Sequence, residues 1–192
     1  MLIISCHADT GFESHSLLHK EDCYHGHMDN FAGVYGVMKS YFSGRITNNH
    51  TRIELTYGEE TDMEGAKEVA STLTDQDTVI IVDVTGTPTS KDLVIEKCKN
   101  PIMKSYLTEA LNGLHYDLYA DCPDPVSCWD ETDIYSQITP YCCFLGVPCQ
   151  RGDYNQGQVS CRKQSVEMLA EAICRLSEYY SEFCRKNNLF VE

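Results

Sequence analysis

The stretch from Val79 to Val84 places the tightest constraint on how this chain of 192 residues can fold. Its first four residues are apolar and β-branched, so both faces of a strand built from them must be kept from water. Such a strand belongs in the middle of a sheet that is covered on both sides. Asp83 lies near its end, and Thr85-Gly86-Thr87-Pro88 then breaks the run.

Segments with strand and helix patterns alternate along the rest of the chain. Strands are predicted over residues 2–6, 53–57, 79–84, 115–120 and 141–145, the last one ended by Gly146-Val147-Pro148. Helices are predicted over residues 31–42, 63–73, 100–112 and 163–186, with a polar, His-rich loop over 8–28 and a loop over 121–135 that leads into a short helix. This alternation is typical of an α/β fold, here a single three-layer domain with a central, mostly parallel or mixed sheet covered by helices. No repeat or linker divides the sequence, so we expect one domain over residues 1–192.

Composition excludes several classes of function. Lys and Arg number 15 against 29 Asp and Glu, for a net charge of −14, which argues against a nucleic-acid or anionic-membrane partner. No apolar run approaches the roughly 18 residues of a membrane span. The 11 cysteines are odd in number and follow no secretion signal, so we expect reduced thiols in a cytoplasmic protein. We expect several to be buried, and these are Cys6, Cys142, Cys143 and Cys174.

Acidic and histidine side chains recur where the predicted strands end. They are His7, Asp9, Glu59, Glu60 and Asp83, with Asp29 at the start of the first helix. Taken singly, an Asp at a strand end commonly caps the next helix, and a Glu pair commonly lies on the surface. Taken together, they indicate a site, because ligands of α/β folds bind beyond the carboxyl ends of the strands.

Four motifs, in this order, resemble those of the co-catalytic zinc exopeptidases. They are His7-Ala8-Asp9-Thr10-Gly11, Gly26-His27-Met28-Asp29-Asn30, Tyr57-Gly58-Glu59-Glu60 and the segment from Asp77 to Thr85. The last is especially similar to the deblocking (tetrahedral) aminopeptidase branch. Thr132-Asp133 and the Gly146-Val147-Pro148 turn also lie where that family has related pairs and turns. The resemblance covers nearly the whole chain.

The resemblance implies a zinc-dependent aminopeptidase that hydrolyses short peptides or small amides with metal-activated water. It implies four metal ligands, which are His7, Asp29, Glu60 and Asp83, with Asp29 bridging two ions. Glu59 would be the general base, and Asp9 would hold the second ring nitrogen of His7. One or two Zn²⁺ ions suit these nitrogen and oxygen donors, with Co²⁺ or Mn²⁺ as alternatives.

Two departures from the family pattern matter. Asn155 stands where the family places its final His ligand, and no His follows His115. His25 or His27 are the candidates to compensate. In addition, only 22 positions separate His7 from Asp29, so the lid or dimerisation domain that the deblocking branch inserts there is absent. A second copy in a homo-oligomer would then have to supply the missing substrate surface.

Three functional hypotheses remain open at the level of sequence. The first is the active aminopeptidase, and the second is a degenerate, non-catalytic binding module with an incomplete metal site. The third is a one-metal hydrolase of another amide. Glu59 favours hydrolysis, because a structural relic has no need of a carboxylate beside the metal ligands. The segment from Trp129 to Asp133 either lines the mouth of the site or begins a helix.

Overall fold

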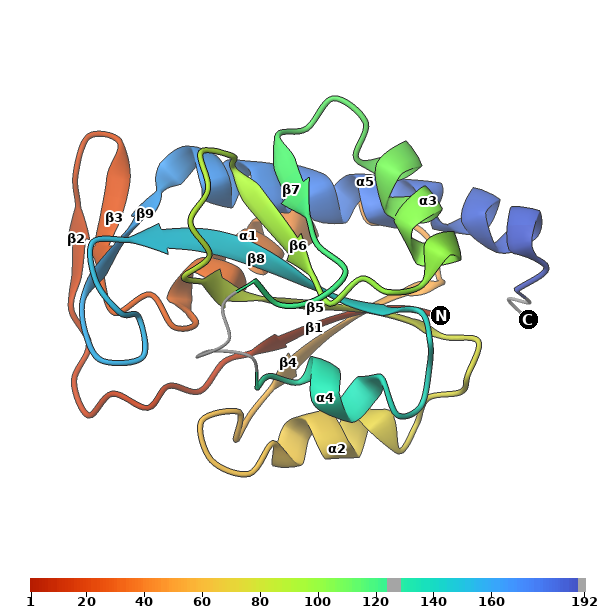
Figure 1. Ribbon diagram of the computed structural model, residues 1–192, viewed down its shortest axis with the longest axis horizontal. Coiled ribbons are helices and arrows are strands. Elements are labelled where there is room, and N and C mark those ends of the chain that lie inside the picture. The colour runs from red at the N-terminus through yellow and green to blue at the C-terminus, as the bar shows by residue number, and fades with distance from the viewer. Residues whose placement is uncertain (124–128, 190–192) are drawn as a thin grey trace.

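Four parallel strands form the centre of the fold in the computed structural model, which describes residues 1–123 and 129–189 (Figure 1). They are β1 (Leu2–His7), β4 (Thr51–Thr56), β5 (Thr78–Thr85) and β8 (Cys142–Gln150), in the order β8-β5-β1-β4. All eight residues of β5 are buried, as the apolar run predicts. β5 therefore lies inside the sheet, between β1 and β8.

Shorter strands make the sheet mixed. β2 (Leu17–His19), β3 (Cys23–Gly26) and β9 (Val159–Arg162) extend it beyond β8 with antiparallel pairings. β6 (Leu93–Glu96) pairs antiparallel with β8, and β7 (Tyr116–Leu118) pairs parallel with β6. The β2–β3 hairpin occupies the left end of the molecule in Figure 1, beside β9.

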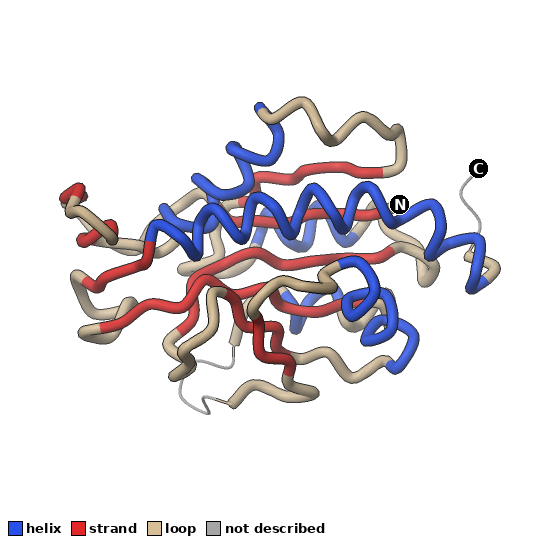
Figure 2. Tube along the Cα trace, turned by 90° about the horizontal axis from the view of Figure 1, so that it is seen from above, coloured by secondary structure: helices blue, strands red, loops and turns tan. Residues whose placement is uncertain are grey.

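Helices cover both faces of the sheet and complete the three layers (Figures 1 and 2). One face carries α1 (Phe31–Phe42), α3 (Pro101–Ala110) and α5 (Lys163–Asn187), and the other carries α2 (Glu64–Ala70) and α4 (Thr132–Tyr135). Alternate residues of β5 join different apolar clusters: Ile80 and Val82 pack on the α1 and α5 side, whereas Ile81 packs on the α2 and α4 side. The predicted α/β class is confirmed.

Asn30 fixes the start of α1. Its side-chain oxygen accepts a hydrogen bond from the Gly33 N–H at 3.1 Å, the usual N-cap arrangement. Its Nδ2 donates to the carbonyl of Val82 in β5 at 2.9 Å, and the residue is only 3% exposed. Asn30 is therefore the cap, and it ties α1 to the central strand. The preceding Asp29–Asn30 peptide bond is cis.

Several predictions about elements were wrong. β8 does not end at Gly146 but runs on to Gln150. The expected loop over residues 8–28 contains β2 and β3, and β6 and β9 were not predicted at all.

The four cysteines expected to be buried are buried free thiols. Within the described ranges, no helix is long and apolar enough to cross a membrane.

Candidate metal centre

Three separate segments bring His7, Asp29 and Asp83 together. His7 ends β1, Asp83 lies two residues before the end of the neighbouring β5, and Asp29 directly precedes the Asn30 cap of α1. β1 and β5 are paired in parallel, so residues near their carboxyl ends lie side by side. The hydrogen bond from Asn30 to β5 brings the adjacent Asp29 to the same place.

Both carboxylates face the same ring nitrogen of His7. Nε2 lies 3.1 Å from Asp29 Oδ1 and 3.2 Å from Asp83 Oδ2. One donor atom from each of the three residues lies within 4.8 Å of the others. The residues are 2%, 7% and 7% exposed, respectively, so this is a buried group of charges.

Burial and mutual charge shift the acid–base equilibria of this group. Burial alone would lower the pKa of His7, but the carboxylates of Asp83 and Asp29 outweigh it and raise that pKa to about 12. Burial raises the pKa of Asp83 to about 7, with the nearby His7 opposing the shift. The three residues therefore hold a proton that a metal ion would have to displace.

Asp9 lies behind the His7 ring. Its Oδ1 is 3.4 Å from His7 Nδ1 and 3.5 Å from the backbone nitrogen of Glu59, whose N–H it accepts. The approach to Nδ1 lacks the alignment of a hydrogen bond, and Nδ1 has no other partner among the residues described. Asp9 is thus next to the His7 ring, and its hydrogen bond to that ring remains a prediction.

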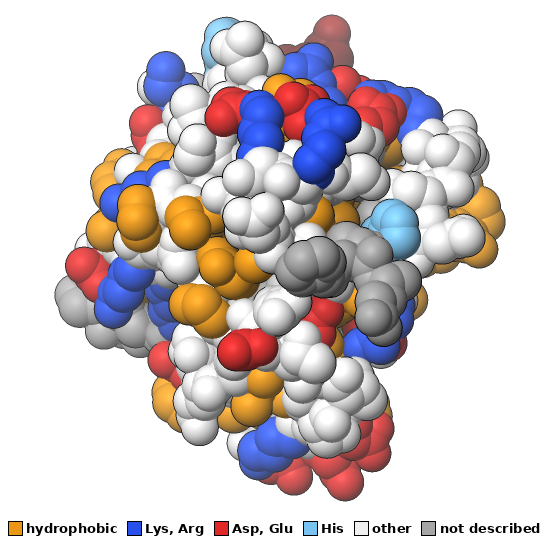
Figure 3. Space-filling view, turned by 90° about the vertical axis from the view of Figure 1, so that its right-hand side faces the viewer, with side chains coloured by type: hydrophobic (Ala, Val, Ile, Leu, Met, Phe, Trp, Pro, Cys, Tyr) orange, Lys and Arg blue, Asp and Glu red, His pale blue; other side chains and the backbone are white. Residues whose placement is uncertain are grey.

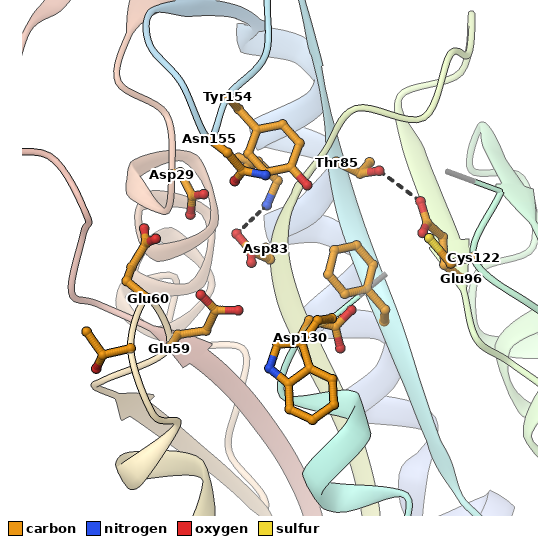
Figure 4. Close-up of a pocket in the computed structure, with 14 residues that line it drawn as sticks. Asp29, Glu59, Glu60, Asp83, Thr85, Glu96, Cys122, Asp130, Tyr154 and Asn155 are labelled. Carbon is orange, nitrogen blue, oxygen red and sulfur yellow. Dashed lines mark hydrogen bonds between the residues drawn. The ribbon is translucent and has the colours of Figure 1, made fainter. Parts of the chain in front are cut away.

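Glu59 and Glu60 follow β4 and face the group across a cavity of about 330 Å³. Figure 4 shows the Glu59 carboxylate pointing toward Asp83 and that of Glu60 pointing toward Asp29. Burial, reinforced by the charge of Asp83, raises the pKa of Glu59 to about 8. Burial also raises the pKa of Glu60, which remains the more exposed of the two. Asn155 lines the same cavity.

The geometry of the three-residue group fits a divalent metal ion. Two ligands of a tetrahedral zinc ion bound at about 2.0–2.1 Å lie about 3.3 Å apart. The two contacts of His7 Nε2, at 3.1 and 3.2 Å, are close to that separation. Asp29 Oδ1 is buried and has no hydrogen-bond partner among the described residues. Imidazole nitrogen and carboxylate oxygen are suitable donors for zinc.

Neither His25 nor His27 joins this group. His25 Nδ1 lies 3.0 Å from the Ser160 hydroxyl, on the hairpin side of the sheet. His27 stacks on Phe12 with ring centroids 4.2 Å apart and lines a second cavity, of about 350 Å³, on another side of Asp29.

The segment from Trp129 to Asp133 both lines the mouth of the site and begins a helix. Trp129 lines the first cavity, and Glu131 is the N-cap of the short α4.

The sequence analysis named Glu131 only within the Trp129–Asp133 segment and did not name Glu96, and both are buried carboxylates. Glu131 is 1% exposed and accepts hydrogen bonds from the hydroxyls of Ser5 in β1 and Thr56 in β4, so it ties α4 to both strands. Glu96 ends β6, is 4% exposed and lines the first cavity. The apolar run Leu93-Val94-Ile95 before Glu96 was a signal that could have identified it as a further acid at a strand end.

Comparison with known proteins identifies the fold but no sequence family. No protein-family model matches the chain, and no curated protein matches it either. A TET aminopeptidase from a marine sediment archaeon of the Thaumarchaeota aligns with a TM-score of 0.67 at 12% identity, over 88% of this chain and 54% of that one. An aminopeptidase from the archaeon Desulfurococcus kamchatkensis gives 0.64 at 12%, over 90% and 54%. The aminopeptidase 1 dodecamer of S. cerevisiae gives 0.54 at 10%, over 84% and 48%.

These similarities confirm an α/β fold of the kind found in aminopeptidases. The chain spans about half the length of the solved structures that it matches. At such low identities the likeness concerns the fold alone. Assignment to the deblocking branch and the absence of a lid from the whole protein stay predictions.

Proposed function

We propose that this chain is a zinc-dependent metallopeptidase, with aminopeptidase action on short peptides or small amides. The observation that carries the proposal is the buried group of His7, Asp29 and Asp83, which faces a cavity also lined by Glu59. The likeness of the fold to that of a TET aminopeptidase supports it.

Each residue of the site then has a distinct task. His7, Asp29 and Asp83 would hold one metal ion, and Glu60, across the cavity from Asp29, would serve a second. When bound, a zinc ion polarises a carbonyl and lowers the pKa of a water molecule. Glu59 would accept the proton of that water and pass it to the leaving amine, for which its raised pKa is suited. Asp9 would keep His7 in the required orientation.

Asn155 supports a weak or empty second metal position. It lines the cavity beside Tyr154, so it stands within the site. An amide is a poor zinc ligand compared with imidazole. The same observation favours the alternative, a non-catalytic binding module, if one ion is not enough for hydrolysis. A homo-oligomer is also proposed, in keeping with the dodecamer that shares this fold.

Metal content and hydrolysis test the proposal together. Purified protein is supplemented with zinc, and bound metal is measured by elemental mass spectrometry. We expect the wild type to retain zinc, Asp29→Ala to lose most of it, and Asp75→Ala, which removes an exposed carboxylate from a turn, to match the wild type. Glu59→Gln should keep the metal but lose hydrolysis of aminoacyl-coumarin substrates. Zinc retained equally by Asp29→Ala would refute the assignment of the ligands.

A further inference from the structure

Glu96 is a second acidic centre in the cavity beside the group of His7, Asp29 and Asp83, here called the metal group. The hydroxyls of Thr85 and Thr87 both donate to its Oε1, each at 2.8 Å, and neither bonds Oε2. Figure 4 shows Glu96 across the cavity from Glu59 and Glu60, joined to Thr85 by the dashed line. The neutral hydroxyls orient the carboxylate without balancing its charge.

No described cationic side chain lies within ion-pair distance of Glu96, unlike another acid of the cavity wall. Asp130 also lines the cavity, but its Oδ2 is 3.0 Å from the Lys97 ammonium. The described lining residues include six acids and no Lys, Arg or His. Glu96 is 4% exposed, so water solvates its carboxylate poorly as well. The structure thus presents a buried negative charge that a cationic ligand group could balance.

The distance between Glu96 and the metal group suits a side chain. Thr85 follows Asp83 by two positions on the same face of β5, which is about 6.6 Å along a strand. The α-amino nitrogen of a peptide is separated from the first carbonyl carbon by one atom, so it stays beside the metal group. A lysine ammonium lies four methylene groups further out and reaches a carboxylate several ångströms away.

Apolar surface is available for such a methylene chain. Phe144 and Trp129 line the cavity together with Thr85. Gly146 allows the packing of this wall, because a Cβ there would lie 2.6 Å from Thr85 Cγ2 and 2.7 Å from Phe144 Cε1. A ligand with an apolar stem and a cationic end therefore matches both the wall and Glu96.

We infer that Glu96 selects substrates whose amino-terminal residue is basic, by pairing with the ammonium or guanidinium of a Lys or Arg side chain. This inference rests on the proposed peptidase function, because that function sets where the first carbonyl of the substrate lies. Thr85 and Thr87 act as positioning residues that hold Oε1 of Glu96 and leave Oε2 for the ligand.

Binding of two matched amides tests the inference without requiring hydrolysis. Isothermal titration calorimetry compares lysinamide with norleucinamide, which has a similar side-chain stem but no charge. We expect the wild type to bind lysinamide at least about tenfold more tightly, the usual effect of a charge-assisted hydrogen bond. Glu96→Gln keeps an oxygen that accepts from both threonines and removes the charge, so it should lose the preference.

Asp121→Asn is the matched control, because it removes the same charge from an exposed side chain that pairs with Lys99 on the surface. It should retain the preference for lysinamide. Equal binding of the two amides by the wild type, or no binding of either, would overturn the inference without any variant. A preference that persists in Glu96→Gln would overturn it too.

Hydrolysis of lysyl- and norleucyl-coumarin amides, measured in parallel, separates the two proposals. A lysinamide preference that depends on Glu96, with neither coumarin amide cleaved, would support the basic-residue site and refute the peptidase function. Cleavage of both amides at equal kcat/KM, with equal binding, would support the peptidase and refute the role of Glu96.

Discussion

The imidazole of His7 keeps a proton at neutral pH in the protein without metal, because two carboxylates face the same ring nitrogen. Its pKa is raised to about 12, although burial alone would lower it. Buried carboxylates need a cation nearby, and here either a proton on His7 or a metal ion can meet that need. The two cations compete for the same nitrogen and oxygen atoms.

Zinc binding near pH 7 should therefore release protons, and zinc affinity should rise between pH 6 and 8. Both folded pKa values lie above those of free side chains, about 12 for His7 and about 7 for Asp83, so raising the pH favours the deprotonated ligands. Calorimetry in buffers of different ionisation enthalpy measures the number of protons released. An affinity that is independent of pH over this range would contradict the competition.

Asn155→His should increase the number of zinc ions bound per chain. The residue is exposed and lines the cavity with Glu60, so an imidazole there would add a better donor near that carboxylate. Elemental analysis after zinc supplementation measures the ratio, and Asn188→His, at the exposed end of α5, is the control for an added histidine. An unchanged ratio would mean that the 153–157 loop does not serve the second position.

Proximity of the central residues could be predicted from sequence, but their surroundings could not. His7 and Asp83 follow apolar runs, and parallel neighbours bring such ends together. Glu96 is held by hydroxyls from β5 and the loop after it, and Glu131 by hydroxyls from β1 and β4, and nothing local in their sequence specifies those contacts. The roles assigned to Asp9, Glu59 and Glu60 stay predictions, although all three lie around the site.

At the scale of elements, α1 and α5 pack closely because Gly36 has no side chain. A Cβ at this position would lie 2.4 Å from Cδ2 of Leu169, which is fully buried in α5. Close contact between the two helices in turn fixes α1, whose Asn30 cap adjoins Asp29. The glycine thus contributes to the placement of a candidate ligand.

Gly36→Ala should lower the free energy of unfolding by about 1–2 kcal/mol. Overpacking typically costs about 1–3 kcal/mol, and the better helix propensity of Ala returns up to about 1 kcal/mol. Urea denaturation measures the difference. Gly157→Ala is the control, because no atom of the described residues lies within 4 Å of the position of its Cβ, and it should change stability by less than about 0.5 kcal/mol. A Gly36→Ala protein as stable as the wild type would show that the Leu169 side chain moves to accept the added methyl group at no cost in stability.

The elements that sequence predicted poorly are those that depend on neighbours. β8 continues past Gly146, where the absent side chain makes room for Thr85 and Phe144. Along the edge of β8 that faces away from β5, the described pairing with β6 ends at Gly146 and that with β9 begins at Cys149. Pro148 lies between these two stretches, where its missing N–H breaks no pairing with either strand. β2 has only three residues, Leu17-Leu18-His19, which are too few to show the alternation of a strand, and all three are exposed. By contrast, the long apolar periodicity of α5 predicts its bounds to within one residue.

At the scale of the whole molecule, the net charge of −14 is spread unevenly. On the face shown in Figure 3, Lys and Arg side chains alternate with Asp and Glu along the upper edge, and hydrophobic side chains gather below them. The cavity with the metal group, in contrast, has six acids and no basic side chain among its described lining residues. Repulsion among these acids destabilises the folded chain until a cation is bound.

Zinc should raise the stability of the whole fold. A ligand present at 100 times its Kd that binds only the native state adds about 2.7 kcal/mol to the free energy of unfolding. Thermal unfolding with and without a chelator measures this as an increase in Tm. Asp29→Ala should show no increase, because it lacks one of the three central ligands. A similar increase in both proteins would mean that zinc binds elsewhere.

The long separation of the ligands along the chain has a kinetic consequence. His7 and Asp83 are 76 positions apart and meet only when β1 and β5 are paired. A parallel pairing of this kind closes a long loop, and we expect this slow closure to limit the rate of folding. The ion can therefore bind only after the rate-limiting step, so zinc should slow unfolding and leave the rate of folding unchanged.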